Sequence, residues 1–366
     1  MHIGIDGSRA FLKRRTGIEE YAYQVIASLR SELRSEEVTL YIRGDQSVSF
    51  EVPKNWRIKK LRALRFWTQV RLSLEMLLSP PDVLFVPAHI VPLIHPKRTV
   101  VTIHGLEYEI FKDSYSFLAR LYMRYSIRFS CKAASRIVAV SESTKRDLMR
   151  LYGIRGNKIE VIYEGISASL IDQPLPVTPH SAFLGEGTRE AKKPYLLFIG
   201  RLEERKNIVR IIKMFEILKR EHGIPHTLKL AGKPGFGYGK IQEALRGGGR
   251  EIEELGYVHE EEKGDLMKNA DIFLFPTLYE GFGLPVLEAQ ALGVPVITSL
   301  TSSLPEIAGG GALFVDPLRP TDMAEKTWRL ISEKVLRDDI IAKGHENARR
   351  FSWERCAESL SRVLGK

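Results

Sequence analysis

Short apolar runs alternate with longer amphipathic stretches along the first half of the chain. Residues 2–6 (HIGID) form one apolar run, and the stretch after it spaces Ile18, Tyr21, Val25 and Leu29 at helical intervals. Further β-branched runs follow in the order VTLYI, VLFVP, TVVTIH and RIVAVS, with amphipathic pieces between them. Strands that alternate with helices predict a parallel sheet covered by helices on both faces.

This alternation is interrupted between about 173 and 194 and then begins again. The interruption holds prolines and glycines without a sustained period, which is typical of an interdomain linker. Beyond it, YLLFIG, TLKLAG, IEELGYV, DIFLFP, PVITS and ALFVDP are strand candidates. We therefore predict two parallel-sheet α/β domains, residues 1–175 and 190–350, that face each other across a cleft. A C-terminal helix at about 352–366 is expected to pack back on the first domain.

The composition and the cysteine count indicate an intracellular protein. Of the 366 residues 44% are hydrophobic and 27% charged, which is ordinary for a soluble protein. Cys131 and Cys356 are too few for a disulfide framework or a cysteine-rich metal site. The sequence has neither a signal-peptide pattern at its start nor an apolar run long enough to span a bilayer. We expect a cytoplasmic protein, and peripheral attachment to the cytoplasmic face of the membrane stays open.

The net charge of +10 is concentrated in the first half of the chain. Residues 1–176 hold 27 Lys and Arg against 18 Asp and Glu, whereas residues 177–366 hold 28 against 27. This asymmetry favours an anionic partner for the first half: a membrane surface, a phosphorylated acceptor or nucleic acid. Because no RNA- or DNA-reading motif occurs, we do not expect nucleic acid.

Two basic segments of the first half, 57–72 and 117–136, interleave Arg and Lys with aromatic and aliphatic residues. Such segments lie in the headgroup region of an anionic membrane, or they pack into a core with solvated arginines at its rim. Both readings stay open from the sequence. The arginines expected to carry a membrane contact are Arg62, Arg65, Arg120 and Arg124.

Two glutamates flank a turn rich in glycine and proline in YEGFGLPVLE, residues 279–288. The stretch follows the strand candidate DIFLFP, and Pro285 suits the first turn of a helix. Glu280 would then lie on a loop and Glu288 one turn into the helix, whose N-terminal N–H groups favour an anion. A sugar nucleotide matches this site, since it has hydroxyl groups at both ends and a diphosphate between them.

A second strand-to-helix turn carries two cations. YLLFIGRLEERKN ends a strand at Gly200 and continues with Arg201 and Lys206. Cations at such a turn can bind a diphosphate and stabilise it as it leaves, although an Arg or Lys at a helix start is often only solvated. With no Asp-x-Asp motif and no clustered His and Cys in the sequence, we expect no metal and assign its electrostatic role to these cations.

The ordered set of motifs resembles retaining GT-B glycosyltransferases of family 4. It comprises FIGRLEERKN, LGYV, NADIFLFPTLYEGFGLPVLEAQALGVPVITS and SSLPEIAGGGALFVDP over about 195–320, with a looser likeness in RRTGIEEYAYQV and VTIHGLEYE. The resemblance implies two Rossmann-like domains and a hexosyl transfer. It also implies that no enzymatic nucleophile is used, so that stabilisation of the leaving diphosphate supplies most of the catalysis.

The resemblance further implies a role for each matching residue. Glu280 would bind the hydroxyl groups of the transferred sugar, and Glu288 those of the ribose. His104 would face the reacting sugar from the first domain, although many relatives have His-Asp where this chain has His104-Gly105. The remaining implied contacts are to the diphosphate, by Arg201, Lys206 and the backbone of Gly17, Phe282, Gly283 and Leu284, and to the base, by Gly256, Tyr257 and Val258.

The resemblance implies a nucleotide-sugar donor, GDP- or UDP-linked, and no other cofactor. We expect mannose from GDP-mannose first, and a growing surface glycan or a polyprenyl-diphosphate-linked acceptor. Two alternatives stay open: a GT-B sugar-nucleotide epimerase, and a non-catalytic scaffold subunit that kept the fold.

Overall fold

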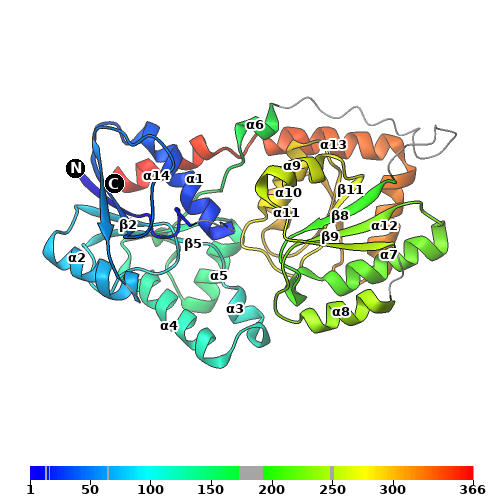
Figure 1. The fold of residues 1–366 in the computed structure, drawn as a ribbon, viewed down its shortest axis with the longest axis horizontal. Coiled ribbons are helices and arrows are strands. Elements are labelled where there is room, and N and C mark those ends of the chain that lie inside the picture. The colour runs from blue at the N-terminus through cyan, green and yellow to red at the C-terminus, as the bar shows by residue number, and fades with distance from the viewer. Residues whose placement is uncertain (13–14, 16, 64–65, 173–192, 248–250, 366) are drawn as a thin grey trace. The chain divides into compact units, whose positions relative to one another are not determined.

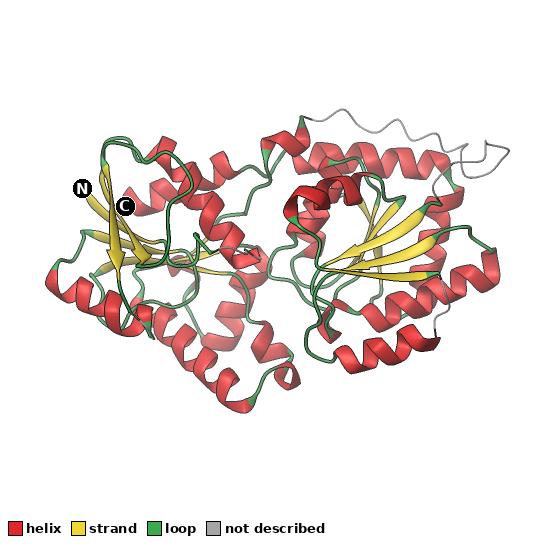
Figure 2. Ribbon diagram, viewed as in Figure 1, coloured by secondary structure: helices red, strands yellow, loops and turns green. Residues whose placement is uncertain are grey.

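The chain folds into two α/β units, each built on a parallel sheet with helices on both faces (Figures 1 and 2). The computed structural model describes residues 1–366 apart from 13–14, 16, 64–65, 173–192, 248–250 and 366. Unit 1 consists of Met1–Gly165 and Phe351–Lys366, and unit 2 of Ile166–Arg350. The predicted linker at 173–194 lies almost wholly outside the described residues, so the predicted domain boundaries at 175 and 190 stay predictions.

Unit 1 has a seven-stranded sheet in the order β3-β2-β1-β4-β5-β6-β7, with all neighbours parallel. Its strands are β1 (His2–Asp6), β2 (Glu37–Arg43), β3 (Trp56–Leu61), β4 (Val83–Val86), β5 (Arg98–Ile103), β6 (Arg136–Ala139) and β7 (Ile159–Val161). Its helices are α1 (Gly17–Glu32), η1 (Trp67–Leu72), α2 (Ser73–Leu78), α3 (Glu107–Ile110), η2 (Lys112–Ser114), α4 (Phe117–Ala133), α5 (Glu142–Tyr152), η3 (Gly156–Lys158) and α14 (Trp353–Gly365).

Unit 2 has a six-stranded sheet in the order β10-β9-β8-β11-β12-β13, again parallel. Its strands are β8 (Tyr195–Ile199), β9 (Thr227–Ala231), β10 (Ile252–Gly256), β11 (Ile272–Phe275), β12 (Val296–Ser299) and β13 (Ala312–Val315). Its helices are α6 (Ala168–Ile171), η5 (Glu204–Lys206), α7 (Ile208–His222), α8 (Tyr238–Gly247), α9 (Glu260–Lys268), α10 (Leu284–Ala291), α11 (Leu304–Ala308), α12 (Pro320–Ser332) and α13 (Lys334–Ala348).

The C-terminal helix α14 belongs to the first half of the chain by packing. In Figure 1 the red helix α14 lies beside the blue helix α1, and Trp353 packs edge-on against Tyr21 with ring centroids 5.9 Å apart. The backbone of Gly165 approaches Trp353 so closely that an added Cβ would lie 2.2 Å from the Trp353 nitrogen. A side chain at position 165 would therefore displace the start of α14.

The strand order reverses once in each sheet. In unit 1 the reversal falls between β1 and β4, and in unit 2 between β8 and β11. Adjacent connections leave in opposite directions at such a point, and this opens a crevice beyond the carboxyl ends of the two strands, where ligands of open α/β sheets bind. The two reversals thus mark where the site of each unit is expected.

Local sequence signals set several helix ends. The Ser141 hydroxyl accepts a hydrogen bond from the Thr144 N–H at the start of α5, and Gly153 ends that helix with φ 64°. Pro285 occupies the first turn of α10, as its missing N–H favours. The predicted GT-B architecture of two parallel-sheet α/β domains is confirmed.

A buried triad of Asp271, His226 and Arg337 holds the amino-terminal edge of the sheet in unit 2. Asp271, just before β11, lies 2.8 Å from His226 Nε2 and 2.7 Å from the Arg337 guanidinium of α13. Burial alone would raise the pKa of the Asp271 carboxyl, but the His226 hydrogen bond and the Arg337 charge hold it below the ordinary 3.8. Asp271 therefore stabilises the fold only while it is ionised.

We predict that Asp271→Asn lowers the free energy of unfolding by about 3 kcal/mol near neutral pH, because Arg337 stays buried without its carboxylate. The folded-state pKa of Asp271 lies below its unfolded value, so the contribution is complete above about pH 5 and is lost as the pH falls through the folded pKa. Urea unfolding of both proteins between pH 7 and pH 3 measures this. A gap that stays constant down to pH 3 would contradict it.

Candidate functional site

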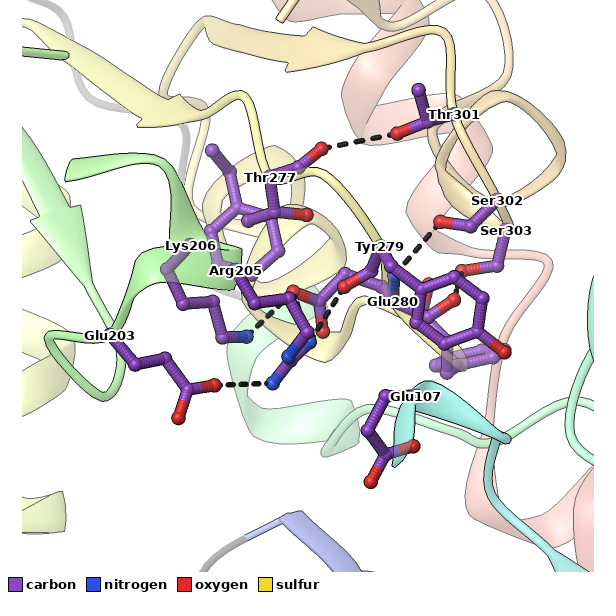
Figure 3. A network of polar contacts seen from close by, with 12 residues as sticks. Glu107, Glu203, Arg205, Lys206, Thr277, Tyr279, Glu280, Thr301, Ser302 and Ser303 are labelled. Carbon is purple, nitrogen blue, oxygen red and sulfur yellow. Dashed lines mark hydrogen bonds and ion pairs between the residues drawn. The ribbon is translucent and has the colours of Figure 1, made fainter. Parts of the chain in front are cut away.

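The strand reversal of unit 2 carries a buried ion pair. After β8 the chain forms η5, whose last residue Lys206 is 9% exposed. The Lys206 ammonium donates to Glu280 Oε1 at 2.6 Å and lies 4.9 Å from the Phe275 ring centroid. Figure 3 shows Lys206 and Glu280 pointing toward each other from the loops after β8 and β11. The structure thus brings together two residues predicted from separate motifs.

Arg205, which the sequence did not single out, holds the same carboxylate. Its guanidinium donates to Glu280 Oε1 at 3.2 Å, to the Tyr279 carbonyl at 2.6 Å and to Glu203 at 2.7 Å (Figure 3). Arg205 is therefore committed to protein acceptors and fixes the position of Glu280. The only sequence signal for it was its place beside Lys206.

The loop that carries Glu280 is fixed by hydroxyl groups. The Glu280 N–H donates to Ser302 Oγ at 2.8 Å, and Ser303 Oγ donates to the carbonyls of Glu280 and Phe282 at 3.0 and 2.5 Å. Ser302 has φ 52° and Asn207, directly after Lys206, has φ 66°. Residues other than glycine rarely adopt such positive φ values, and those that do concentrate at functional sites.

Burial and charge oppose each other in this pair. Burial would raise the pKa of the Glu280 carboxyl, but Lys206 and Arg205 hold it below its ordinary value. Burial lowers the pKa of the Lys206 ammonium, and Glu280 offsets only part of that effect. The contact between the two groups therefore favours the charged form of each against burial, and each ion depends on the other.

Glu288 lies on α10 with one oxygen bound and the other unused. Lys263 of α9 donates to Glu288 Oε1 at 2.6 Å and also pairs with Glu260 at 3.2 Å. Burial alone would lower the pKa of Lys263, but the two carboxylates raise it above its usual range. Glu288 Oε2 is buried and has no hydrogen-bond partner among the described residues. A buried carboxylate oxygen of this kind is costly unless a ligand donates a hydrogen bond to it.

The sequence did not single out Lys263, because it follows three glutamates at the start of a helix that looks fully solvated.

Glycines line the carboxyl ends of three neighbouring strands of unit 2. Gly200, Gly232 and Gly256 follow or end β8, β9 and β10 with φ values of 154°, 152° and 68°. A Cβ on Gly232 would lie 1.8 Å from the Gly200 carbonyl oxygen, so no side chain fits there. The close approach of these two backbones therefore requires glycine at position 232.

Other predicted residues of unit 2 lie on the same rim. Arg201 follows Gly200 and is exposed, with its aliphatic stem over Gly235. Tyr257 is 38% exposed, with the Lys233 ammonium 4.5 Å from its ring centroid, and Val258 is half-buried. Their contacts to a diphosphate and a base stay predictions.

The predicted backbone site at the start of α10 is formed by a tight turn. Phe282 is buried, Gly283 has φ 123°, and Leu284 is the first residue of the helix. A Cβ on Gly283 would lie 3.0 Å from the Leu304 side chain. The turn therefore needs glycine on both conformational and steric grounds. Its contact with a diphosphate stays a prediction.

Unit 1 places His104 directly after β5 with both ring nitrogens engaged. Its Nδ1 lies 3.2 Å from Glu164 Oε1 and its Nε2 lies 2.9 Å from the Pro87 carbonyl oxygen. The side chain is only 8% exposed. Gly17 begins α1, and a Cβ on it would meet no atom within 4 Å among the described residues. The sugar-contacting role of His104 and the diphosphate contact of Gly17 stay predictions.

Comparison with known proteins identifies the family. A family model described as "Glycosyl transferases group 1" matches residues 184–347, and one described as "Glycosyltransferase Family 4" matches residues 15–170. The chain is 30% identical over 266 residues to an O-antigen chain mannosyltransferase B of Escherichia coli, covering 71% of this chain and 68% of that protein. The chain belongs to glycosyltransferase family 4.

Solved structures share the fold of this glycosyltransferase. WaaG, a glycosyltransferase involved in lipopolysaccharide biosynthesis, superimposes with a TM-score of 0.73 at 16% identity, over 99% of each chain. Anabaena Alr3699/HepE in complex with UDP-glucose gives a TM-score of 0.73 at 15% identity, over 100% of this chain and 99% of that one. These likenesses establish the GT-B fold of the glycosyltransferase.

Two features of the described part of the glycosyltransferase bear on metal binding and on membrane insertion. Within that part, no group of three or more His, Cys, Asp and Glu side chains is arranged to hold a metal ion. Also within it, no helix has both the length and the hydropathy to cross a membrane. The predicted independence from metal stays a prediction.

We predict that Glu280→Gln lowers the free energy of unfolding of the glycosyltransferase by about 3 kcal/mol, because the Lys206 ammonium stays buried without its counter-charge. Adding Lys206→Met to the same chain should restore part of the loss. Asp338→Asn, which breaks an exposed pair with Lys334 on α13, is the control and should cost less than about 1 kcal/mol. Thermal and urea unfolding check this, and equal losses in Glu280→Gln and Asp338→Asn would contradict it.

Proposed function

We propose that this glycosyltransferase is a retaining hexosyltransferase that moves a sugar from a nucleotide donor onto a growing surface glycan or a lipid-linked acceptor. Mannose from GDP-mannose is the first donor to test, because the Escherichia coli relative is an O-antigen chain mannosyltransferase. A uridine nucleotide is the second, because the structural relative HepE forms a complex with UDP-glucose.

The observation that carries the proposal is the Lys206–Glu280 pair beyond β8 and β11. A nucleotide sugar presents a diphosphate and hydroxyl groups side by side, and this pair presents a cation and a carboxylate side by side. Lys206 would bind the diphosphate, while Glu280 would accept hydrogen bonds from hydroxyl groups of the transferred sugar. Arg201 is exposed at the end of the same strand and would supply the second cation. Arg205 would act on the sugar only through Glu280, because its guanidinium is bound to protein oxygens.

The unused Glu288 Oε2 supports a nucleoside at the other end of the donor. Ribose hydroxyl groups are donors of the kind that a buried carboxylate oxygen requires. Lys263 pairs with Glu288 and fixes its orientation through Oε1. Phe282 to Leu284 would contact the diphosphate through backbone N–H groups, and Gly256 to Val258 would line the base.

In the proposed reaction the bond between the sugar C1 and the diphosphate oxygen breaks, and the acceptor hydroxyl oxygen forms a bond to C1 on the same face. The hydroxyl proton passes to the departing diphosphate. Negative charge grows on the diphosphate in the transition state, so cations fixed beside it lower the barrier without a divalent metal. Loss of one such contact typically costs on the order of 3 kcal/mol, or a hundredfold in rate.

We also propose that unit 1 docks on an anionic membrane through a mixed apolar and basic surface. Five side chains of the η1–α2 region are at least 45% exposed: Phe66, Val70, Leu74, Leu77 and Leu78. On α4, Leu118, Tyr122 and Tyr125 are 52–75% exposed. Exposed apolar residues gathered in this way are unusual on a soluble surface unless they meet a partner. A lipid surface fits them, because the same half of the chain carries the excess positive charge.

The loop after β4 connects the two helical parts of this surface. The Ile94 N–H donates to Ser73 Oγ of α2, at 3.3 Å, and the Val91 N–H donates to Ser130 Oγ of α4, at 2.9 Å. Among the arginines expected to touch lipid, Arg62 is exposed and Arg120 half-buried, whereas Arg65 lies outside the described residues. Arg124 is an unsuitable test position, because it is paired with Glu109 in a network that includes Tyr152.

We predict that Lys206→Met and Glu288→Gln fail differently when nucleotide release from GDP-mannose is measured in excess EDTA. Lys206→Met should lower kcat about a hundredfold, because the lost charge acts on the leaving group. Glu288→Gln should mainly raise the donor KM, on the order of tenfold, because ribose contacts are equal in ground and transition states. Lys343→Met, an exposed lysine of α13, is the control and should behave as wild type. Equal kcat losses in both variants, or loss of all activity in EDTA that magnesium restores, would contradict the proposal.

We predict that the wild type binds vesicles containing phosphatidylglycerol and that the double substitution Leu77→Glu, Leu78→Glu weakens binding at least tenfold. Burying one leucine is worth about 1.5–3 kcal/mol, so two losses are easily measured. Val335→Glu in unit 2 removes a side chain that is 84% exposed and should have no effect. Binding should also fall with salt, because exposed charges are screened. If the wild type does not bind these vesicles at low salt, membrane docking is excluded.

A further inference from the structure

The strand reversal of unit 1 carries a histidine that no predicted role includes. β1 and β4 meet at this reversal, and β4 is followed by Pro87, Ala88 and His89. Ligands of open α/β sheets bind beyond the carboxyl ends of strands at such a point. His89 therefore occupies in unit 1 the kind of position that Glu280 occupies in unit 2.

The backbone at His89 adopts an unfavourable conformation. Its φ is 39°, and the Ile90 N–H donates to the Ala88 carbonyl at 2.5 Å, which closes a γ-turn centred on His89. The His89 N–H is fixed at the same time by the Thr102 carbonyl of β5 at 3.0 Å. A β-carbon at positive φ costs free energy that glycine at this position would avoid. A histidine at such a strained position points to a use for its ring.

The neighbouring ring of His104 has no nitrogen left for a ligand. Its Nδ1 and Nε2 both lie at hydrogen-bonding distance of protein oxygens, on Glu164 and Pro87. Each of the two ring nitrogens is therefore occupied by a protein oxygen. A sugar hydroxyl could bind a His104 nitrogen only after one of these bonds broke.

His89 offers what His104 lacks. Its ring packs edge-on against His104 with centroids 5.3 Å apart, and the side chain is half-buried. Burial, and then the charge of His104 and Arg9, lowers the pKa of His89 to about 3, so the ring is neutral. The Nδ1 atom is buried without a hydrogen-bond partner among the described residues. A buried N–H without an acceptor is rarer than a buried acceptor without a donor. The proton is therefore placed on Nε2, at the other side of the ring.

We propose that His89 is a further acceptor-binding residue, whose Nε2–H donates a hydrogen bond to a hydroxyl oxygen of the acceptor sugar. This inference rests on the proposed glycosyl transfer. A neutral N–H suits a hydroxyl oxygen, whereas the diphosphate of the donor is better matched by the cations of unit 2. The packing of His89 against His104, itself fixed by Glu164 and Pro87, holds the ring in place for this contact.

The kinetic test uses GDP-mannose as donor and methyl α-mannopyranoside as acceptor probe. His89→Phe keeps a ring beside His104 without the N–H, and should lower kcat/KM for the glycoside by about tenfold to a hundredfold. Hydrolysis of GDP-mannose without glycoside should stay within about twofold of wild type. His89→Gln, which keeps an N–H at similar reach, should recover part of the loss. His89→Gly should melt no lower than wild type, since it relieves the positive φ, yet it should lose acceptor use.

The outcomes separate the two proposals. A wild type that releases no nucleotide from GDP- or UDP-linked sugars would overturn the proposed function. A wild type that transfers, together with a His89→Phe variant that transfers equally well, would overturn only the role of His89. Equal loss of hydrolysis and transfer in His89→Phe would also overturn it, because the ring would then serve the donor or the fold.

A second measurement does not depend on turnover. Nitrogen-15 NMR of histidine-labelled protein near neutral pH should show the His89 ring, assigned by its absence in His89→Gln, as the neutral Nε2–H tautomer. Methyl α-mannopyranoside should shift the His89 ring signals and leave those of His345, on α13, unchanged. A charged or Nδ1-protonated ring, or a His89 signal that does not respond to the glycoside, would overturn the inference.

Discussion

A buried ammonium must have a counter-charge within reach, and this constraint organises unit 2. Lys206 comes from the loop after β8 and Glu280 from the loop after β11, and the two meet only because these strands are neighbours in the sheet. Either ion alone would carry a large desolvation cost. The fold and the site thus depend on the same contact, since the register that forms the sheet also joins the pair.

The residues around this pair fix its geometry at some cost in free energy. Asn207 and Ser302 adopt positive φ on either side of it, and Ser302 receives the Glu280 N–H. Arg205 adds a second cation to the same carboxylate oxygen and is anchored on Glu203. Such preorganisation benefits a reaction in which charge develops on a leaving group. The polar groups around the site are already in place, so they need not reorient in the transition state.

The sequence predicted most of the fold, because buried parallel strands appear as short apolar runs. It missed β3 and β7. β3 is an edge strand whose middle four residues are exposed and mostly charged, so its basic pattern suggested a membrane-binding segment instead. β7 has only three residues. In both cases the strand is formed by pairing with a neighbour, and no local pattern reports that pairing.

The candidate site was predictable where a motif lies at a strand end, and less so where partners come from elsewhere. Glu280 and Lys206 could be named from their own segments. Lys263 and Glu164 could not, because each is defined by a contact across a large sequence separation, to Glu288 and His104. The interpretation of His104 as a sugar contact likewise came from its place after β5, whereas its availability depends on the Pro87 and Glu164 oxygens.

The two strand reversals use the same topological constraint for different chemistry. In unit 2 the reversal is lined by paired charges, which suit a charged diphosphate and a hydroxylated sugar. In unit 1 a series of rings ends at the reversal: Trp353, Tyr21, His104 and His89 follow one another edge-on, with centroids 4.5–5.9 Å apart. The last ring of this series, His89, has a buried nitrogen, Nδ1, without a protein partner among the described residues. Hydroxyl groups are uncharged ligands. A series of packed rings that ends in an N–H can orient them without the desolvation cost of a charge. The acceptor site of the proposed reaction therefore depends more on the position of a ring than on charge, whereas the donor site depends on paired charges. The residues at the two strand reversals fit this difference.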